Sequence, residues 1–305
     1  MTRRIANAPV TWGVWGPHSL PAHRRPADIL KTLQQSGYAG VETGPLRFFA
    51  DSDEALAETL NQYELECAGA YVPLRPLHGV EVMAGDLEYL REVCKAFGHF
   101  KNPGPVILAE ETEDAIKQHV RRGKDETDLD LSPSDWGVLI EGFNEAARIV
   151  RDHGLMVSYH PHTGTHIEQP HEVDRLLEDT DLDFTLDTGH AAAGGDDSID
   201  LVDRWASRIN HVHVKDLIDA PVEKARRERI TFGMAEAAAP LGKGDLDLDG
   251  FMNKLQAVGY DGWIVVEQDR RPDGGHDHAA VDQEQKENFD WVFARSEWLS
   301  TNPNS

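Results

Sequence analysis

The sequence predicts a single-domain α/β protein with the (β/α)8 TIM barrel fold over residues 1–300. Short β-branched runs alternate with amphipathic helical stretches, there are eight of each, and polar side chains follow the strands of the second half. Such alternation implies parallel strands joined by right-handed crossovers. An open doubly wound sheet shows the same alternation, but the count of eight and the polar strand ends favour the barrel, and no GxGxxG motif follows the first strand.

Eight short apolar runs are the expected strands. The first half of the chain carries four of them, at residues 5–10, 38–42, 66–72 and 105–109. The second half carries the other four, at residues 155–159, 184–186, 209–214 and 263–266. Their content of β-branched and other apolar residues is typical of strands.

The stretches between these runs are the expected helices. Gly37, Gly98 and Gly154 follow three of these stretches, where glycine commonly ends a helix. Ser132 and Ser134 are both suitable N-caps for the long fourth helix. The helices are expected at residues 26–36, 52–63, 84–97, 134–153, 170–178, 248–258 and 283–299, with a further one around 201–205.

Two segments are expected to be insertions between barrel elements. One lies near residues 110–132 and is rich in charge, and the other lies near 217–245 and contains the basic run 224–229. Loops of this length in a compact domain are typically lids or binding loops, with a solvated surface excursion as the alternative. Residues 301–305 are expected to form a disordered tail.

The composition limits the classes of protein that the chain can represent. A length of 305 residues with 40% hydrophobic residues is ample for a buried core, and a formal net charge of −24 argues against nucleic acid or an anionic membrane as a partner. Two cysteines do not make a disulfide framework, so a reducing cytosol is expected. Because the sequence shows no signal peptide and no apolar run long enough to span a bilayer, we expect a cytoplasmic protein.

Polar motifs follow the four late strands. In order they read YHPHTGTHIE at 159–168, LDTGH at 186–190, HVHVKD at 211–216 and VVEQD at 265–269. The carboxyl ends of barrel strands converge on one mouth, so these imidazoles and carboxylates can meet around one divalent ion. A mixed set of nitrogen and oxygen donors suits Mn²⁺, Co²⁺, Fe²⁺, Zn²⁺ or Mg²⁺.

Each motif alone is a weak signal, since a single histidine at a strand end is more often a hydrogen-bonded structural residue. Side chains two positions apart on a strand face the same side. His211 and His213 could therefore both be ligands, or one could be a ligand beside a packed or supporting histidine. The prediction of a metal centre depends on four such motifs in succession.

These motifs resemble those of the xylose-isomerase-like sugar isomerase and epimerase superfamily. Within it, the YHPHTGT and VVEQD motifs and the opening NAPVTWG at 7–13 resemble inosose (2-keto-myo-inositol) dehydratases. The glycines of Gly242-Lys243-Gly244 match a Gly-x-Gly turn of the superfamily. The likeness runs from about residue 5 to about residue 270 and is clearest from 155 to 269.

The resemblance implies a set of metal ligands. The superfamily's metal-binding Asp, His and Glu fall on Asp187, His213 and Glu267. Many of its epimerases also place a glutamate at the end of the fifth strand, as a ligand and as one of two opposed bases, and this sequence has His160 there. The expected cofactor is a divalent metal, Mn²⁺ or Co²⁺ before Mg²⁺, Zn²⁺ or Fe²⁺, and the expected ligands are His160, Asp187, His213 and Glu267.

The strand-end positions, together with the resemblance for Glu42 and His190, suggest residues that handle the substrate. Candidates for the general base and acid, whose individual roles the sequence leaves open, are Glu42, Glu168, His190 and Lys215. Substrate contacts are expected from Trp12, His162, His190 and His211. Trp12 has an alternative role as packing at the end of the barrel.

The histidine in place of the strand-five glutamate disfavours a two-base epimerisation, whereas an elimination needs one base and one acid. The sequence therefore predicts a hydro-lyase that dehydrates a cyclic polyol ketone such as 2-keto-myo-inositol through an enediolate. The alternatives are a ketose 3-epimerase or isomerase, a keto-glycoside β-eliminating lyase, and a catalytically inactive sugar-binding barrel. The expected partners are a small-molecule polyol or sugar ketone and further copies of the chain in a homo-oligomer.

Overall fold

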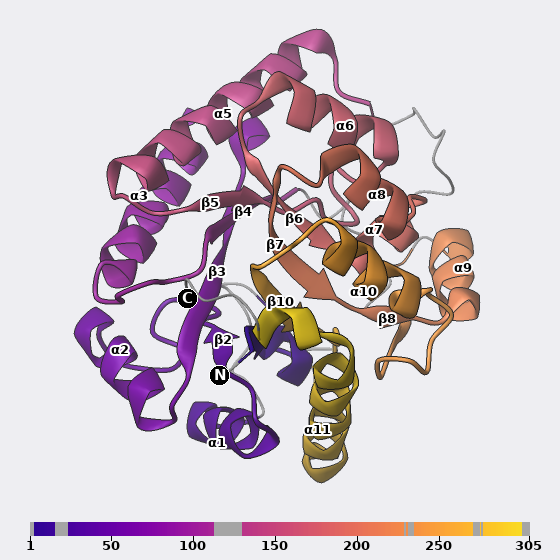
Figure 1. The fold of residues 1–305 in the computed structure, drawn as a ribbon. Helices are drawn as coiled ribbons and strands as arrows, with labels where there is room; N and C mark the ends of the chain where they lie inside the picture. The colour runs from indigo at the N-terminus through magenta and orange to yellow at the C-terminus, as the bar shows by residue number, and fades with distance from the viewer. Residues whose placement is uncertain are drawn as a thin grey trace.

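The computed structural model describes residues 3–15, 24–112, 130–228, 230, 235–270, 275 and 277–300. Across these residues, parallel strands form a closed barrel in the order β1-β10-β7-β6-β5-β4-β3-β2, with helices around its outside (Figure 1). The fold class predicted from the sequence is confirmed. The barrel strands are β1 (Ile5–Asn7), β2 (Gly40–Glu42), β3 (Glu66–Leu74), β4 (Val106–Glu110), β5 (Val157–Tyr159), β6 (Asp183–Asp187), β7 (Ile209–Val214) and β10 (Trp263–Val266).

The strand register sets the level at which side chains enter the barrel mouth. On β7, His213 pairs with Asp187 of β6 and with Val265 of β10. Side chains two positions apart on a strand face the same side, so Glu267 follows Val265 on the face that His213 occupies. Three late strands therefore present polar groups at one end of the barrel.

Helices cover the outside of the barrel. The sequence allowed either Ser132 or Ser134 as the N-cap of the longest helix, and the structure shows that Ser132 is the N-cap. The hydroxyl of Ser132 accepts a hydrogen bond from the amide of Asp135 (3.2 Å), whereas Ser134 lies inside the helix. Gly37 and Gly154 adopt left-handed backbone just after their helices, with φ of 98° and 73°. The helices are α1 (Pro26–Ser36), α2 (Asp53–Gln62), α3 (Val80–Phe97), α5 (Pro133–Asp152), α6 (Pro170–Asp179), α7 (Thr188–Gly194), α8 (Ser198–Trp205), α9 (Asp219–Glu228), α10 (Leu248–Ala257) and α11 (His278–Arg295), with 3-10 turns η1 (Pro9–Trp12), η2 (Pro76–His78) and η3 (Glu297–Ser300).

Several boundaries differ from the sequence-based expectation. Strand β1 stops at Asn7 rather than at residue 10, because Pro9 has no amide hydrogen and starts η1. Helix α3 begins before residue 84, and α11 begins before residue 283. Helix α7 is absent from the expectation, because the glycine-containing stretch after β6 has no helical period; the carboxylate of Asp187 caps it.

The insertion near 217–245 contains regular structure. It holds α9, which carries residues 224–228 of the basic run, and β9 (Ala238–Ala239), which pairs antiparallel with β8 (Asp216–Leu217). Residues 229 and 231–234 of this insertion lie outside the described residues. So do residues 113–129 of the insertion near 110–132, and the tail 301–305.

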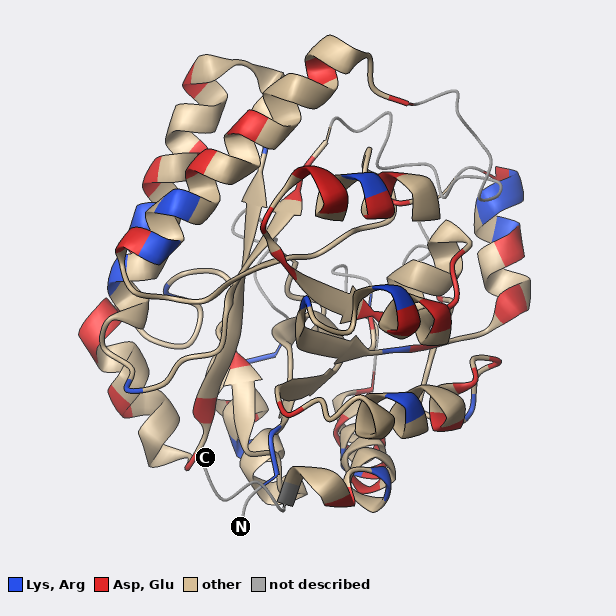
Figure 2. Cartoon of the chain, turned by 45° about the horizontal axis from the view of Figure 1, so that its top comes forward, with Lys and Arg blue, Asp and Glu red and all other residues tan. Residues whose placement is uncertain are grey.

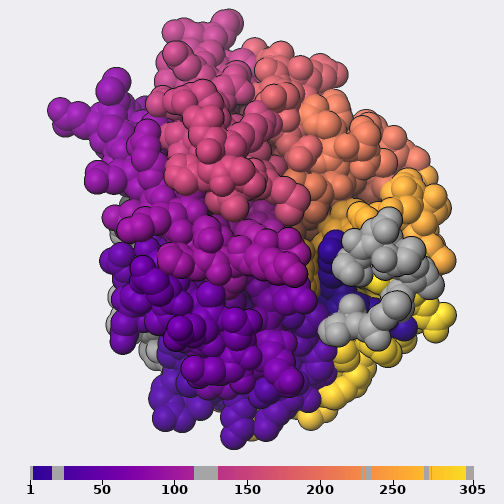
Figure 3. Space-filling view, turned by 60° about the vertical axis from the view of Figure 1, so that its left-hand side comes forward, coloured from indigo at the N-terminus to yellow at the C-terminus, as the bar shows by residue number. Residues whose placement is uncertain are grey.

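The surface and the closure of the barrel follow from this arrangement. Aspartate and glutamate positions are distributed over the outer helices in Figure 2, in keeping with the net charge of −24. The first and last parts of the chain lie side by side on the surface (Figure 3). In the interior, β1 pairs with β10 and closes the barrel. Within the described ranges, no helix combines the length and the apolar character needed to cross a membrane.

Candidate metal centre

Four buried side chains from neighbouring strand ends meet at the mouth of the barrel. His160 follows β5, Asp187 ends β6, His213 lies in β7 and Glu267 follows β10. Nδ1 of His213 lies 3.6 Å from Oδ2 of Asp187 and 3.3 Å from Oε2 of Glu267. Nε2 of His160 lies 3.9 Å from the same Asp187 oxygen. The structure thus brings together the residues that the sequence predicts as metal ligands.

The central donor atoms of this group are available to a ligand. The amide of His190 donates to Oδ1 of Asp187 (2.8 Å), and Oδ2 is left facing the histidines. Oδ2 of Asp187 and Nδ1 of His213 are buried and form no hydrogen bond with any described residue, although the ammonium of Lys215 forms an ion pair with that Asp187 oxygen at 3.2 Å. A buried polar atom without a hydrogen bond is costly and calls for an explanation. Imidazole nitrogens and carboxylate oxygens are donors for first-row divalent ions, so these residues fit such a cation.

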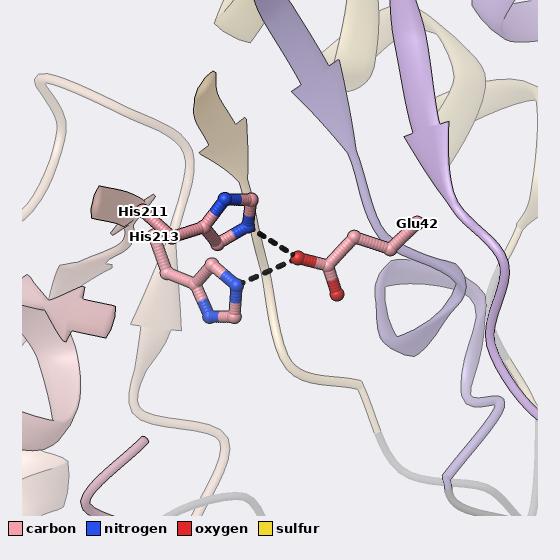
Figure 4. Close-up of side chains that lie close together, drawn as sticks. All are labelled: Glu42, His211 and His213. Atoms are coloured by element: carbon pink, nitrogen blue, oxygen red, sulfur yellow. Dashed lines mark hydrogen bonds and ion pairs between the residues drawn. The ribbon is translucent and has the colours of Figure 1, made fainter. Parts of the chain in front are cut away.

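Glu42, at the end of β2, reaches across the barrel interior to both histidines of β7. Its Oε1 lies 2.8 Å from Nε2 of His211 and 2.8 Å from Nε2 of His213 (Figure 4). A carboxylate oxygen only accepts, so both Nε2 atoms carry hydrogens. Nδ1 of His213 is therefore the nitrogen left to bind a cation, and this nitrogen faces Asp187 and Glu267.

This geometry separates the two histidines of the HVH motif. His213 faces the other candidate ligands, whereas His211 contacts Glu42 from deeper in the barrel. Glu42, His211 and His213 are also close enough to hold an ion among themselves, but their hydrogen bonds already satisfy the facing atoms. A ligand histidine held by a carboxylate is a common arrangement in metal sites. The contacts favour one ligand and one supporting histidine.

Burial and charge shift the pKa values in this group in opposite directions. Burial would raise the pKa of Glu42, but His213 and His211 beside it hold that pKa below the usual range of a carboxyl. Burial would lower the pKa of His213, yet Glu267 and Glu42 hold that pKa well above the usual histidine value. Burial and the neighbouring His213 together lower the pKa of His160. A cation held at Nδ1 of His213 would compete with a proton for this nitrogen.

Lys215 is buried beside the candidate ligands. Its Nζ lies 3.2 Å from Oδ2 of Asp187, 3.2 Å from Oε2 of Glu267, and donates to Oδ2 of Asp269 at 3.0 Å. Burial would lower the pKa of Lys215, but Asp187, Asp269 and Glu267 raise it. The ammonium is therefore held charged among three carboxylates. Lys215 is positioned to stabilise negative charge on a molecule bound at this mouth.

The small residues of the LDTGH motif fit against Lys215. A Cβ placed on Gly189 would lie 2.7 Å from Cδ of Lys215, so the lysine stem occupies the space that a larger residue would need. The hydroxyl of Thr188 donates to the carbonyl of Lys215 (2.6 Å) and accepts from its amide (2.8 Å). The motif that supplies Asp187 thus also fixes the backbone and side chain of the lysine.

The histidine-rich loop after β5 forms one wall of the site. The rings of His162 and His190 lie 3.9 Å apart between centroids, at an interplanar angle of 40°. Both rings, with Glu168 and Asp187, line a cavity that also reaches Phe184 of β6 and Leu201 of α8 and does not include the other candidate ligands. Oε2 of Glu168 accepts from the amide of Gly164 (2.7 Å), which folds the loop back on itself. Burial, reinforced by the neighbouring His162, lowers the pKa of His190 well below its usual value, so that ring is neutral.

Residues 30–294 match the family described as xylose isomerase-like TIM barrel. The chain belongs to this family. An inosose dehydratase from Geobacillus kaustophilus (strain HTA426) is 32% identical to it over 285 residues, which cover 90% of this chain and 89% of that protein. As the sequence predicts, this xylose isomerase-like TIM barrel protein is an enzyme, and lyases are among its relatives.

Solved structures share the fold of this xylose isomerase-like TIM barrel. The IOLI protein with a binding zinc atom has a TM-score of 0.70 at 15% identity, over 98% of this chain and 100% of that chain. The probable 3-DHS dehydratase AsbF from Bacillus anthracis has a TM-score of 0.66 at 16% identity, over 95% of this chain and 98% of that chain. At these identities the likeness shows the fold alone.

In this family member, further side chains lie near the candidate site that the sequence motifs did not predict. Tyr71 of β3 packs against His160 and His162, with ring centroids 6.4 and 6.5 Å away. Glu110, at the end of β4, lies 2.5 Å from Nδ1 of His166 and also accepts from the His166 amide (2.8 Å). Tyr71 lies inside the apolar run of β3, and Glu110 ends β4 at the start of the expected insertion, so neither belongs to one of the four late motifs. Asp269 is also missing from the predicted site residues. It lies two residues after Glu267 in VVEQD, so its position after the last strand could have indicated it.

Trp12 lies in η1, where the structure favours packing over substrate contact. Its side chain is buried in the main hydrophobic core, which is the alternative role that the sequence left open. Its Nε1 is buried without a hydrogen bond to a described residue. The neighbouring Trp15 donates from Nε1 to the carbonyl of Arg270 (2.8 Å) and so ties η1 to the segment after β10.

Proposed function

We propose that this protein is a divalent-metal-dependent dehydratase that removes water from 2-keto-myo-inositol or a closely related cyclic polyol ketone. The observation that carries the proposal is His160, whose Nε2 lies 3.9 Å from Asp187, at the strand end where two-base epimerisation calls for a carboxylate. An elimination needs only one base next to the ketone and one acid for the departing hydroxyl. The 32% identity to an inosose dehydratase over 90% of the chain supports the same reaction class.

The candidate ligands would hold the cation through imidazole nitrogens and carboxylate oxygens. The chemistry that a divalent cation supplies when bound is Lewis-acid stabilisation of the negative charge on the ketone oxygen. We propose Mn²⁺ or Co²⁺ first, while Mg²⁺, Zn²⁺ and Fe²⁺ also accept a mixed donor set. The residues that would hold the ion are His160, Asp187, His213 and Glu267.

The other charged residues support the same negative charge. The ammonium of Lys215, 3.2 Å from both Asp187 and Glu267, donates into the space where the oxygens of an enediolate would lie. Glu42 accepts the Nε2–H of His213 and keeps Nδ1 turned towards the cation. We therefore assign Glu42 a positioning role, in place of the acid–base role that the family resemblance suggested.

The test is a substrate panel on the purified chain with added Mn²⁺ or Co²⁺, followed by NMR in D₂O and by absorbance. Inosose should lose water and give a diketone absorbance. Deuterium exchange of a ketose without loss of water would instead identify an epimerase or isomerase. Elimination from a keto-glycoside but not from inosose would identify a β-eliminating lyase, and absence of both turnover and metal binding would identify an inactive sugar-binding barrel.

Variants of the candidate ligands test the site. Asp187→Ala and His213→Ala should each lose bound metal in elemental analysis, and turnover should fall with it. Asp174→Asn is a matched control, because its carboxylate accepts from Trp205 (2.7 Å) and belongs to α6 on the outside of the barrel. Full metal content and full turnover in both ligand variants would refute the assignment.

A further inference from the structure

Three buried amide side chains lie next to the candidate ligand Glu267 and are called the amide cluster below. Gln268 directly follows that ligand in the chain, while Gln285 and Asn288 belong to α11, and all three are at most 4% exposed. Oε1 of Gln285 also accepts from Nδ2 of Asn7, the last residue of β1 (3.1 Å), so the cluster lies where β1 and β10 meet. Glutamine and asparagine are mostly exposed in proteins, and burying an amide is costly unless it is hydrogen-bonded.

Every side-chain polar atom of the amide cluster has a partner. Oε1 of Gln268 accepts from Nε2 of Gln285 (3.1 Å) and from Nδ2 of Asn288 (3.3 Å). Nδ2 of Asn288 also lies 3.3 Å from Oε1 of Gln285. Two outer partners complete the set. Nε2 of Gln268 donates to Oε2 of Glu284 (3.1 Å), and Oδ1 of Asn288 accepts from the backbone amide of Leu241 (2.8 Å).

The two outer partners determine which way the amides point. A carboxylate only accepts and a backbone amide only donates, so Nε2 of Gln268 faces Glu284 and Oδ1 of Asn288 faces Leu241. Oε1 of Gln268 is then left to accept from α11, whose two amides turn their NH₂ groups towards it. The cluster therefore has one hydrogen-bonding arrangement. A fully satisfied buried network of this kind makes its surroundings rigid.

Consecutive residues after β10 are held from different sides. Oε2 of Glu267 lies 3.3 Å from Nδ1 of His213 and 3.2 Å from Nζ of Lys215 at the barrel mouth. Gln268 instead contacts α11 on the outside of the barrel. Asp269 then returns to the mouth and accepts from Lys215 (3.0 Å). The side chain of Gln268 is thus the link that holds the backbone of Glu267 to a helix.

We propose that the amide cluster positions Glu267 as a metal ligand, so that α11, which supplies none of the four candidate ligands, helps to set the affinity for the cation. This inference rests on the proposed function, because it concerns the metal centre of the same site. Gln285 and Asn288 act through Gln268 and are positioning residues rather than catalytic ones. Apolar side chains of the same size would fill the space, but apolar packing has no direction, whereas these hydrogen bonds hold Gln268 in one orientation.

Gln285→Met tests the cluster, because methionine keeps the length of the side chain and removes the donor to Gln268. In calorimetric titration of metal-stripped protein, its affinity for Mn²⁺ should fall about tenfold, the lower end of the usual effect of residues that support a ligand. Val292→Ala is the matched control, since Val292 is fully buried on the same helix. The control should lower the melting temperature of the metal-free protein and keep the wild-type affinity. Wild-type affinity in Gln285→Met, or an equal loss in Val292→Ala, would overturn the proposal.

A double-mutant cycle tests whether Gln285 acts through Gln268. Gln268→Met removes the same contact from the other side, so the double variant should bind Mn²⁺ about as weakly as Gln268→Met alone. Residues in contact that serve one purpose give such non-additive effects. Fold-losses that multiply in the double variant would mean that the two residues act independently, which contradicts the positioning role.

Hydrogen exchange of the wild type is a test that needs no variant to fold. Coupling between two sites is reciprocal, so a cation that depends on the amide cluster must also stabilise it. Added Mn²⁺ should slow exchange at residues 284–288 of α11 more than in α3, which packs against β3 and α5. Equal slowing in both helices would show only general stabilisation and would refute the coupling.

Turnover of inosose separates failure of this inference from failure of the proposed function. If the wild type binds Mn²⁺ but does not dehydrate inosose, the proposed function fails, while the Mn²⁺ affinities of the variants still decide this inference. If the wild type dehydrates inosose and Gln285→Met keeps the wild-type Mn²⁺ affinity, only this inference fails. A wild type that binds neither Mn²⁺ nor Co²⁺ would overturn this inference together with the metal dependence of the proposed function.

Discussion

Replacing Glu42 by glutamine is expected to weaken metal binding about 10-fold to 100-fold in a barrel that still folds, the usual effect of removing a residue that orients a ligand histidine. The substitution keeps the shape of the side chain and its acceptor oxygen but removes its charge. It changes both hydrogen bonds at Oε1, which come from His211 and His213 at 2.8 Å each.

The size of the effect can be worked from these two bonds. A hydrogen bond to a charged group contributes about 1.5–3 kcal/mol, and a neutral one about 0.5–1.5 kcal/mol. Removing the charge therefore weakens each bond by about 1 kcal/mol, or the pair by about 2 kcal/mol. At about 1.4 kcal/mol per tenfold change in affinity, a loss of about 2 kcal/mol corresponds to about 30-fold weaker metal binding. This value applies if the full loss of hydrogen-bond energy appears in the binding free energy of the cation.

Calorimetric titration of metal-stripped protein with Mn²⁺ measures the affinity, and thermal melting in EDTA measures the fold. Asp174→Asn is the control, because Asp174 accepts from Arg204 (3.2 Å) and Trp205 (2.7 Å) away from the mouth. The control should lose stability but keep its affinity for Mn²⁺. An unchanged Mn²⁺ affinity in Glu42→Gln would refute the positioning role of this carboxylate.

Three further changes test other parts of the structure. Asp216→Ala removes the acceptor for two amides of the turn at 242–244 (2.9 Å each); leaving them unpaired should cost about 1–3 kcal/mol each and raise hydrogen exchange at this turn in mass spectrometry. Gly189→Ala places a methyl 2.7 Å from Cδ of Lys215, so kcat should fall while elemental analysis still finds metal. Burial raises the pKa of Cys94 to about 12; at about pH 8 it should resist a thiol reagent until guanidinium unfolds the protein, and rapid labelling of the native enzyme would contradict its burial.

The barrel and the convergence of the late strands could be predicted because local patterns encode them. Each strand is a short apolar run, and each helix has its own period and caps. Dense polar motifs, such as those that begin at His160 and Asp187, follow directly on strands. Since parallel strands end at one edge, the meeting of these side chains follows without any knowledge of distances.

Contacts across the barrel could not be predicted in this way. Glu42 forms hydrogen bonds with His211 and His213, which lie 169 and 171 positions later in the sequence. No local sequence pattern indicates contacts between residues so far apart. The family resemblance suggested acid–base chemistry for Glu42, whereas the structure places its oxygen between two imidazoles. The contacts of His162 and His190 with Thr163 depend on individual atoms of the loop, which only coordinates reveal.

The position of Glu267 after the last barrel strand determines when the candidate metal centre can form during synthesis. Glu42 emerges from the ribosome 171 residues before His213. At about 5–20 residues per second it waits roughly 10–30 s for that partner, and Glu267 follows later still. The cation can therefore load only after nearly the whole chain has been made. A cation held by His160, Asp187, His213 and Glu267 would link β5, β6, β7 and β10, so its removal should loosen the side of the barrel that is completed last.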